Sequence, residues 1–150
     1  MTKKKIVIIG SGVSGLLCGK RLTKVGHSVL LIDKGRNVGG RLSTRKTDGA
    51  VFHHGASSLP DFYKYKDLPE FGLEMLKRAE KEKVIQRKGN LFEPISSVSH
   101  LVSFFANSLN IQEGCQATSL NLQNKTVYVT YRSGNREKIP YDLLIISIPP

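Results

Sequence analysis

The sequence predicts an α/β fold: an open, mostly parallel sheet with an inserted antiparallel β-meander. Continuous apolar runs at 6–9, 29–32 and 143–148 are typical of strands buried on both faces. A helical pattern of apolar residues separates the first two runs, and short strands with turn residues precede the third. The third run is expected to be a central strand of the sheet.

The other elements follow from local periodicity and turn residues. Apolar residues share one face over 13–25, which predicts a helix that Gly26 caps at its C-terminal end. Two further helices on the surface are expected from similar patterns. These two helices are expected at 68–83 and 96–108. The remaining expected elements are a glycine- and arginine-rich loop at 35–43, a hairpin at 84–92, and meander strands at 117–122 and 126–131.

Length and charge exclude several classes of protein. The 150 residues suit one domain, 1–150, with a real hydrophobic core. The net charge is +11, but the basic residues are spread along the chain and are not interleaved with aromatic residues, so we expect no nucleic-acid partner. No apolar run approaches the roughly 18 residues of a membrane span, so the expectation is no membrane association and a cytoplasmic protein.

Metal sites and nucleophilic catalysis are not predicted. The cysteines, Cys18 and Cys115, have no CxxC or CxxH spacing, and Cys18, on the apolar side of the first helix, is expected to be buried in the core. Neighbouring His53 and His54 would point to opposite faces of a strand, so they would not share a metal ion. No GxSxG elbow of a serine hydrolase occurs. We therefore name no metal ligand and no catalytic residue.

A GxGxxG motif lies between the first strand and the first helix, which is the context that a dinucleotide-binding turn requires. Gly10 permits a tight turn, Gly12 lets the backbone approach a pyrophosphate, and Gly15 lets the helix pack on the strand. The helix N-terminus offers N–H groups to the anion. A glycine-rich turn without a ligand is the alternative. The motif comprises Gly10, Ser11, Gly12, Val13, Ser14 and Gly15.

Asp33 ends the second strand, 18 positions after Gly15. A carboxylate there accepts hydrogen bonds from the ribose hydroxyls of an adenosine and repels a 2′-phosphate. FAD or NAD is therefore favoured over NADP, although Lys34 and Arg36 could bind a phosphate. The alternative is an aspartate that caps a helix or a turn.

A second glycine pair, Gly39-Gly40, is followed at once by Arg41. The glycines let backbone amides approach a ligand closely, and a guanidinium suits phosphate. This loop resembles that of the FAD-dependent amine oxidase superfamily, and the chain is most similar to its renalase-like NAD(P)/FAD-dependent branch. The resemblance runs through DKGR…GGRLSTR, FHHGA at 52–56, FEP at 92–94, ATSL at 117–120, YDLL at 141–144 and SIP at 147–149.

The resemblance implies a Rossmann-like FAD-binding domain and assigns roles within it. The first motif and Asp33 would hold the pyrophosphate and the adenosine ribose, and Gly40 with Arg41 the phosphates. His54-Gly55-Ala56 would lie near the flavin ring, and the Ala117 backbone would meet the adenine where the family commonly has valine. The family often has Asp and Gln at positions 53 and 57, where this chain has His and Ser. The candidate cofactor residues are those of the first motif with Asp33, Lys34, Gly39, Gly40, Arg41, His54, Gly55, Ala56 and Ala117.

The expected function is the FAD-binding N-terminal portion of a flavin-dependent oxidoreductase. The resemblance implies hydride transfer from an amine or dihydronicotinamide-type small-molecule substrate to flavin, with NAD(P)H as one reductant. Relatives continue for roughly another domain, so the chain is expected to be truncated and to lack the part that clamps the flavin and binds substrate. Three alternatives stay open: a non-catalytic remnant, a half-enzyme with a separately encoded C-terminal partner, and an NAD-binding module.

Overall fold

The structure is a computed structural model that describes residues 2–42, 44–47, 50–53 and 55–149. The chain divides into two compact units. The first unit combines Met1–Gly40 with Ser108–Pro150, and the second unit is Arg41–Asn107.

The first unit contains a parallel sheet in the strand order β12-β1-β2-β8. This arrangement confirms the predicted open, mostly parallel sheet, with apolar strands whose side chains pack on both faces. Its strands are β1 (Lys5–Ile9), β2 (Ser28–Ile32), β8 (Asn110–Gln112) and β12 (Leu143–Ile146).

The position of β12 differs from the prediction of a central strand. Among the described residues β12 pairs only with β1, so it is an edge strand of the sheet. Its Leu143 and Ile146 side chains are exposed. The prediction was wrong because an apolar run reports the hydrophobicity of a strand, and this property does not determine how many neighbours hydrogen-bond to its backbone.

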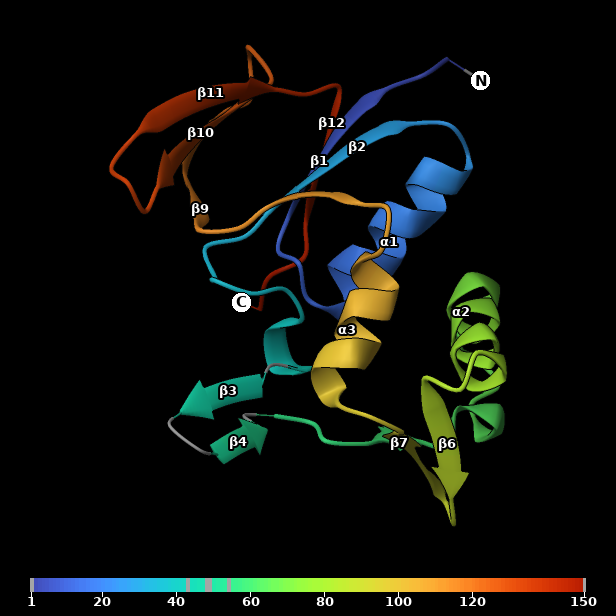
Figure 1. The fold of residues 1–150 in the computed structure, drawn as a ribbon. Coiled ribbons are helices and arrows are strands. Elements are labelled where there is room, and N and C mark those ends of the chain that lie inside the picture. Colours follow the sequence, from blue (N-terminus) through green and yellow to red (C-terminus); the bar gives the residue numbers. More distant parts are fainter. Residues whose placement is uncertain (1, 43, 48–49, 54, 150) are drawn as a thin grey trace. The chain divides into compact units, whose positions relative to one another are not determined.

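Helix α1 (Val13–Lys24) covers one face of this sheet (Figure 1). The two elements approach closely because Gly19 has no side chain: a Cβ there would lie 3.0 Å from Leu31 Cδ1. The helix ends at Lys24, and Gly26 caps it as predicted, with a φ of +94°. The Gly26 amide donates a hydrogen bond to the Thr23 carbonyl, and the His27 amide donates one to the Leu22 carbonyl. This is the pattern of a Schellman cap.

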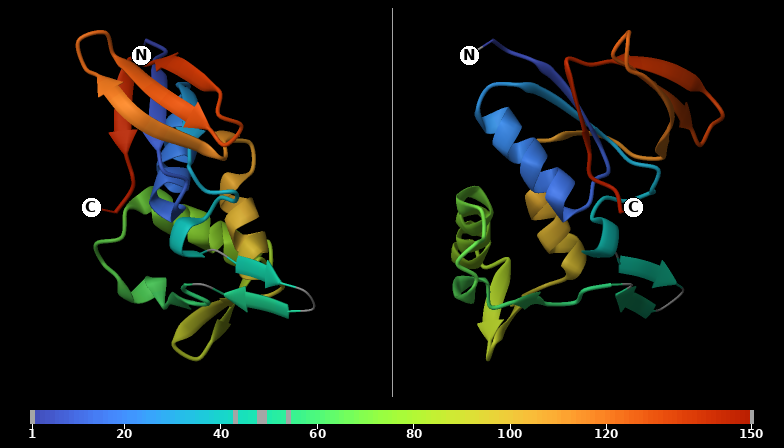
Figure 2. Two further views of the ribbon diagram at one scale, coloured as in Figure 1. Left: turned by 90° about the vertical axis from the view of Figure 1, so that its left-hand side faces the viewer. Right: turned by 180° about the vertical axis from the view of Figure 1, so that it is seen from behind.

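The predicted meander covers the opposite face of the sheet (Figures 1 and 2). It consists of the antiparallel strands β9 (Cys115–Asn121), β10 (Thr126–Tyr131) and β11 (Arg136–Pro140). Alternate residues of β10 point inward and join Val7 of β1 and Ile32 of β2 in one apolar cluster. The parallel sheet is therefore covered by α1 on one side and by the meander on the other.

The second unit contains the two further helices, α2 (Glu70–Lys81) and α3 (Val98–Ala106). Both fall within the predicted ranges, and the Ser97 side chain caps α3 by accepting a hydrogen bond from the His100 amide. The loop predicted at 35–43 contains a 3-10 turn at Gly40–Leu42. The strands of this unit are β3 (Thr44–Thr47), β4 (Ala50–His53), β5 (Leu59–Pro60), β6 (Ile85–Lys88) and β7 (Leu91–Pro94).

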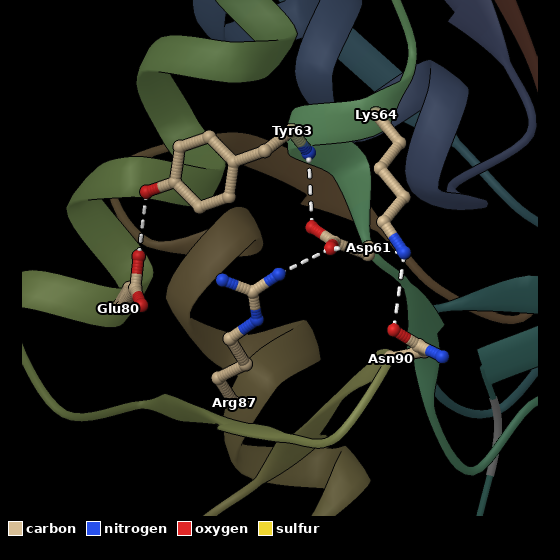
Figure 3. Close-up of polar contacts among 6 residues, drawn as sticks. All are labelled: Asp61, Tyr63, Lys64, Glu80, Arg87 and Asn90. Atoms are coloured by element: carbon tan, nitrogen blue, oxygen red, sulfur yellow. Dashed lines mark hydrogen bonds and ion pairs between the residues drawn. The ribbon is translucent and has the colours of Figure 1, made fainter.

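A buried carboxylate, Asp61, holds the segment after β5 in place (Figure 3). Only 3% of Asp61 is exposed, and its carboxylate accepts hydrogen bonds from the Arg87 guanidinium and, at 3.3 Å, from the Tyr63 amide. Lys64 adds an ion pair at 3.8 Å. The Tyr63 hydroxyl donates to Glu80 at 2.7 Å, and this bond raises the pKa of Tyr63. Protein groups thus neutralise the buried charge, which gives the cluster a structural role.

Candidate functional site

Three polar or glycine positions lie side by side at one edge of the parallel sheet. The last residues of β1, β2 and β12 are in register, because Ile9 pairs with both Ile32 and Ile146. The residues that follow them are Gly10, Asp33 and Ser147. Since parallel strands present their carboxyl ends at the same edge, this edge forms the base of a candidate ligand site.

The three glycines of the first motif differ in their surroundings. Gly10 has a φ of +105°, and a Cβ there would lie 2.7 Å from the Ser147 carbonyl oxygen. A Cβ on Gly15 would overlap the Gly10 carbonyl oxygen, so Gly15 lets α1 pack against the turn. A Cβ on Gly12 would meet nothing within 4 Å. Packing therefore accounts for Gly10 and Gly15, whereas Gly12 faces open space.

The N-terminus of α1 starts at this open space. Gly12 is the N-cap residue, and its carbonyl accepts the first helical hydrogen bond, from the Leu16 amide at 2.9 Å. No side chain among the described residues caps this end of the helix. The amides of the first turn, which includes Val13 and Ser14, and the positive end of the helix dipole therefore suit an anion such as a diphosphate.

Asp33 connects the end of β2 to the glycine turn. Its Oδ2 accepts hydrogen bonds from the Ser11 amide at 2.6 Å and from the Ser11 hydroxyl at 2.7 Å. Its Oδ1 accepts one from the Gly35 amide at 2.7 Å. A carboxylate offers about four acceptor positions, so roughly one is left for a ligand hydroxyl. Asp33 is therefore a turn-forming aspartate that keeps capacity for one further hydrogen bond.

The second glycine pair packs against the first motif, backbone to backbone. Gly39 forms a parallel bridge with Gly12, and its amide donates to the Ser11 carbonyl at 2.9 Å. A Cβ on Gly40 would lie 3.1 Å from the Gly12 Cα. Both Gly39 and Gly40 have positive φ, at +113° and +55°. The structure thus brings both glycine motifs to one place, and the exposed Lys34 lies on the loop between Asp33 and the pair.

The rest of the second loop lies in the other compact unit. The Ala56 amide donates to the Arg41 carbonyl at 3.0 Å, and a Cβ on Gly55 would overlap the same oxygen. The structure therefore brings Arg41 next to Gly55 and Ala56. His54 lies outside the described residues. These residues belong to Arg41–Asn107 and the glycine turn to the first unit.

Ala117 lies on β9, which begins beside Asp33. The Cys115 amide donates to the Asp33 carbonyl at 2.8 Å, and Ala117 follows two residues later, opposite Val129 of β10. Ala117 is half-buried and packs against the apolar cluster beneath the meander. The strand therefore starts on the same side of the sheet edge as Asp33.

The two cysteines are free and poorly suited to nucleophilic chemistry. Cys115 is buried, whereas Cys18 is half-buried rather than a core residue as predicted, because its position on α1 is only partly covered. Burial raises the pKa of both thiols, which lowers the thiolate fraction. Within the described residues, no three His, Cys, Asp or Glu side chains gather as a metal site would require.

Sequence reasoning missed two features of this edge. One is the pairing of Ser11 with Asp33, which no periodicity reveals because the Ser11 amide and hydroxyl donate to the Asp33 side chain between two strand ends. The other is Ser147. The predicted apolar run at 143–148 included Ser147, so the sequence did not mark it as a residue beyond the strand end, as it marked Gly10 and Asp33.

Comparisons of sequence agree with a nucleotide-binding fold. Residues 8–72 match the family described as NAD(P)-binding Rossmann-like domain. Over 62 residues the chain is 44% identical to a 4,4′-diapophytoene desaturase of Staphylococcus aureus strain Newman. That alignment covers 40% of this chain but only 12% of the desaturase.

Comparisons of structure show the fold over almost the whole chain. A reduced UDP-galactopyranose mutase matches 98% of this chain with a TM-score of 0.67 and 16% identity, and 56% of the mutase is covered. CmlS, a flavin-dependent halogenase, matches 96% with a TM-score of 0.60 and 16% identity, and 29% of it is covered. The chain therefore has the Rossmann-like fold and spans only part of the proteins it resembles. No helix in the described part of the chain has the length and apolar character to cross a membrane.

Proposed function

We propose that this chain is the FAD-binding portion of a flavin-dependent oxidoreductase of the amine oxidase superfamily, in its renalase-like branch. The packing of Gly39 and Gly40 against Gly12 carries the proposal. A cradle for NAD alone needs one glycine turn and an acidic residue after β2, and it does not need a second glycine pair in contact with the first. The flavin dependence of the halogenase that shares the fold supports the same choice of cofactor.

The residues of the first unit fit an FAD molecule. The space in front of Gly12 would admit the diphosphate, and the first-turn amides of α1 would donate to it. Asp33 would accept from an adenosine ribose hydroxyl with its remaining acceptor position. The Ala117 backbone would face the adenine, because β9 starts beside Asp33. When bound, the flavin supplies the hydride acceptor for an amine or dihydronicotinamide substrate.

Further roles in the proposal fall on the second unit. Arg41 would pair with the phosphates through its guanidinium, and the segment containing His54, Gly55 and Ala56 would line the flavin side of the site. We propose that the residues selecting the substrate lie outside the part that this chain shares with its structural neighbours, because it covers 56% of the mutase and 29% of the halogenase. A half-enzyme with a separately encoded partner remains one alternative.

NAD binding is the second candidate, and the description of the matched family favours it. The Asp33 carboxylate would repel the 2′-phosphate of NADP, so NAD would be the preferred nicotinamide nucleotide. In this case the second glycine pair would only pack against the first glycine motif and would not contact the ligand.

Titration of the chain with FAD, NAD⁺ and NADP⁺ by calorimetry separates the candidates. We expect FAD to bind most tightly and NADP⁺ most weakly. Replacing the guanidinium, Arg41→Ala, should weaken FAD about tenfold or more, because a hydrogen bond to a charged group contributes about 1.5–3 kcal/mol. Arg136→Ala on β11 changes the charge equally and should leave the affinity for FAD unaltered. Tighter binding of NAD⁺ than of FAD would favour the second candidate.

A further inference from the structure

Ser147 follows β12 at the position where the strand order of the sheet reverses. The chain leaves β1 through α1 toward β2, and β12 lies on the other side of β1. Ligands of open α/β sheets bind in the crevice at such a point, outside the carboxyl ends of the strands. Ser147 is fixed there by its amide, which donates to the Ile9 carbonyl at 2.8 Å.

Ser147 and its neighbour Ile148 contact the glycine turn from the β12 side. A Cβ on Gly10 would lie 2.7 Å from the Ser147 carbonyl oxygen and 3.0 Å from Ile148 Cγ2. The Ser147 hydroxyl would lie 3.4 Å from a Cβ on Gly15. The two residues therefore form a wall beside the turn that the cofactor would cross.

The side chains of this wall are available to a ligand. The Ser147 hydroxyl forms no hydrogen bond with another of the described residues, although it is half-buried. Ile148 is 55% exposed beside the turn. A hydroxyl and an apolar side chain together suit a ligand that carries a polar chain and an apolar ring.

The register of the strand ends determines which part of the ligand passes this wall. Asp33, the glycine turn and Ser147 follow one another along the sheet edge, at the roughly 4.8 Å spacing of neighbouring strands. With the adenosine ribose at Asp33 and the diphosphate at the glycine turn, the other half of the dinucleotide continues toward β12.

We infer that Ser147 and Ile148 bind the half of the dinucleotide beyond the diphosphate: in FAD, the hydroxyl donates to the ribityl chain and Ile148 contacts the ring system. This inference rests on the proposed function. It assigns affinity and specificity for the non-adenosine half to the end of β12.

ADP and FAD together test the inference, because ADP has the adenosine and the diphosphate but lacks the other half. We would measure the dissociation constants of both ligands for the wild-type chain and for Ser147→Ala and Ile148→Ala. Each variant should weaken FAD about three- to tenfold, the loss expected for one hydrogen bond or one partly buried apolar contact, and should leave ADP unchanged. Ser147→Thr keeps the hydroxyl and should retain wild-type affinity for FAD.

Matched controls lie on the same sheet. Ser28→Ala removes an exposed hydroxyl at the start of β2, the opposite edge of the sheet, and Ile146→Ala removes an apolar side chain that is 58% exposed on β12. Neither should change the FAD affinity. Equal FAD affinity of wild type, Ser147→Ala and Ile148→Ala would overturn the inference while the proposed function stands. Equal losses for ADP and FAD would also overturn it, since they would indicate a general disturbance of the turn. A wild-type chain that binds ADP but not FAD would overturn both.

Discussion

Gly12 and Gly15 belong to one motif, but the structure gives them different roles. The space beside Gly12 is open, and its φ of −65° is accessible to alanine. Gly15 has no such freedom, because a Cβ there would overlap the Gly10 carbonyl oxygen. The motif thus combines a residue whose missing side chain serves a ligand with one whose missing side chain serves packing.

The Gly12→Ala and Gly15→Ala variants should therefore separate binding from folding. We expect Gly12→Ala to melt at the wild-type temperature and to bind FAD at least about tenfold more weakly, since its new methyl group enters the space for the diphosphate. Gly15→Ala should lose at least about 1–3 kcal/mol of stability through overpacking against backbone. Melting by circular dichroism and FAD titration measure the two effects. Wild-type FAD affinity in Gly12→Ala would contradict this account of the turn.

Among the elements, β6 carries two basic residues with contrasting surroundings. Arg87 donates to the carboxylate of Asp61, which is 3% exposed, whereas Lys88 pairs with Glu93 at 3.1 Å on the surface. Arg87→Ala should reduce the free energy of unfolding by about 1–3 kcal/mol, because it leaves a buried carboxylate without its main partner. Lys88→Ala should cost about 0.5 kcal/mol or less. Urea denaturation checks both, and equal effects would show that the Asp61 cluster does not stabilise the unit.

The positions of most helices and strands along the chain were predictable from the sequence, whereas the order of the strands within the sheet was not. Apolar periodicity located α1, α2, α3 and the meander, because each buries one face against the sheet or its own unit. Periodicity gave no signal for β8, a strand of three residues that pairs with β2. It also misplaced β12 at the centre of the sheet. Strand order depends on backbone hydrogen bonds between distant segments, which residue patterns do not encode.

The candidate site was predictable to the same degree. Gly10, Gly12 and Gly15 could be found because a tight turn, an open cradle and helix packing each require glycine at a fixed spacing. The contact of Gly40 with Gly12 and the position of Ser147 depend on register between strands. Only the structure, which gives this register, shows that contact and that position.

At the scale of the whole molecule, the net charge and the fold both favour an anionic ligand. The net charge of +11 favours an anionic partner, and the first unit directs a helix N-terminus and two glycine motifs toward one sheet edge. These features belong to Met1–Gly40 and Ser108–Pro150, the segments that hold the parallel sheet and the meander. We therefore expect the chain to hold FAD at this edge of the sheet.

The visible absorbance spectrum of the purified chain, recorded after mixing with FAD and desalting, tests the claim that the chain holds FAD. We expect flavin bands to remain with the protein fraction, shifted from those of free FAD because part of the cofactor leaves water. The same procedure with Gly12→Ala should give a protein with weaker bands. A folded wild-type chain that emerges colourless would contradict the claim and would favour a remnant without a cofactor.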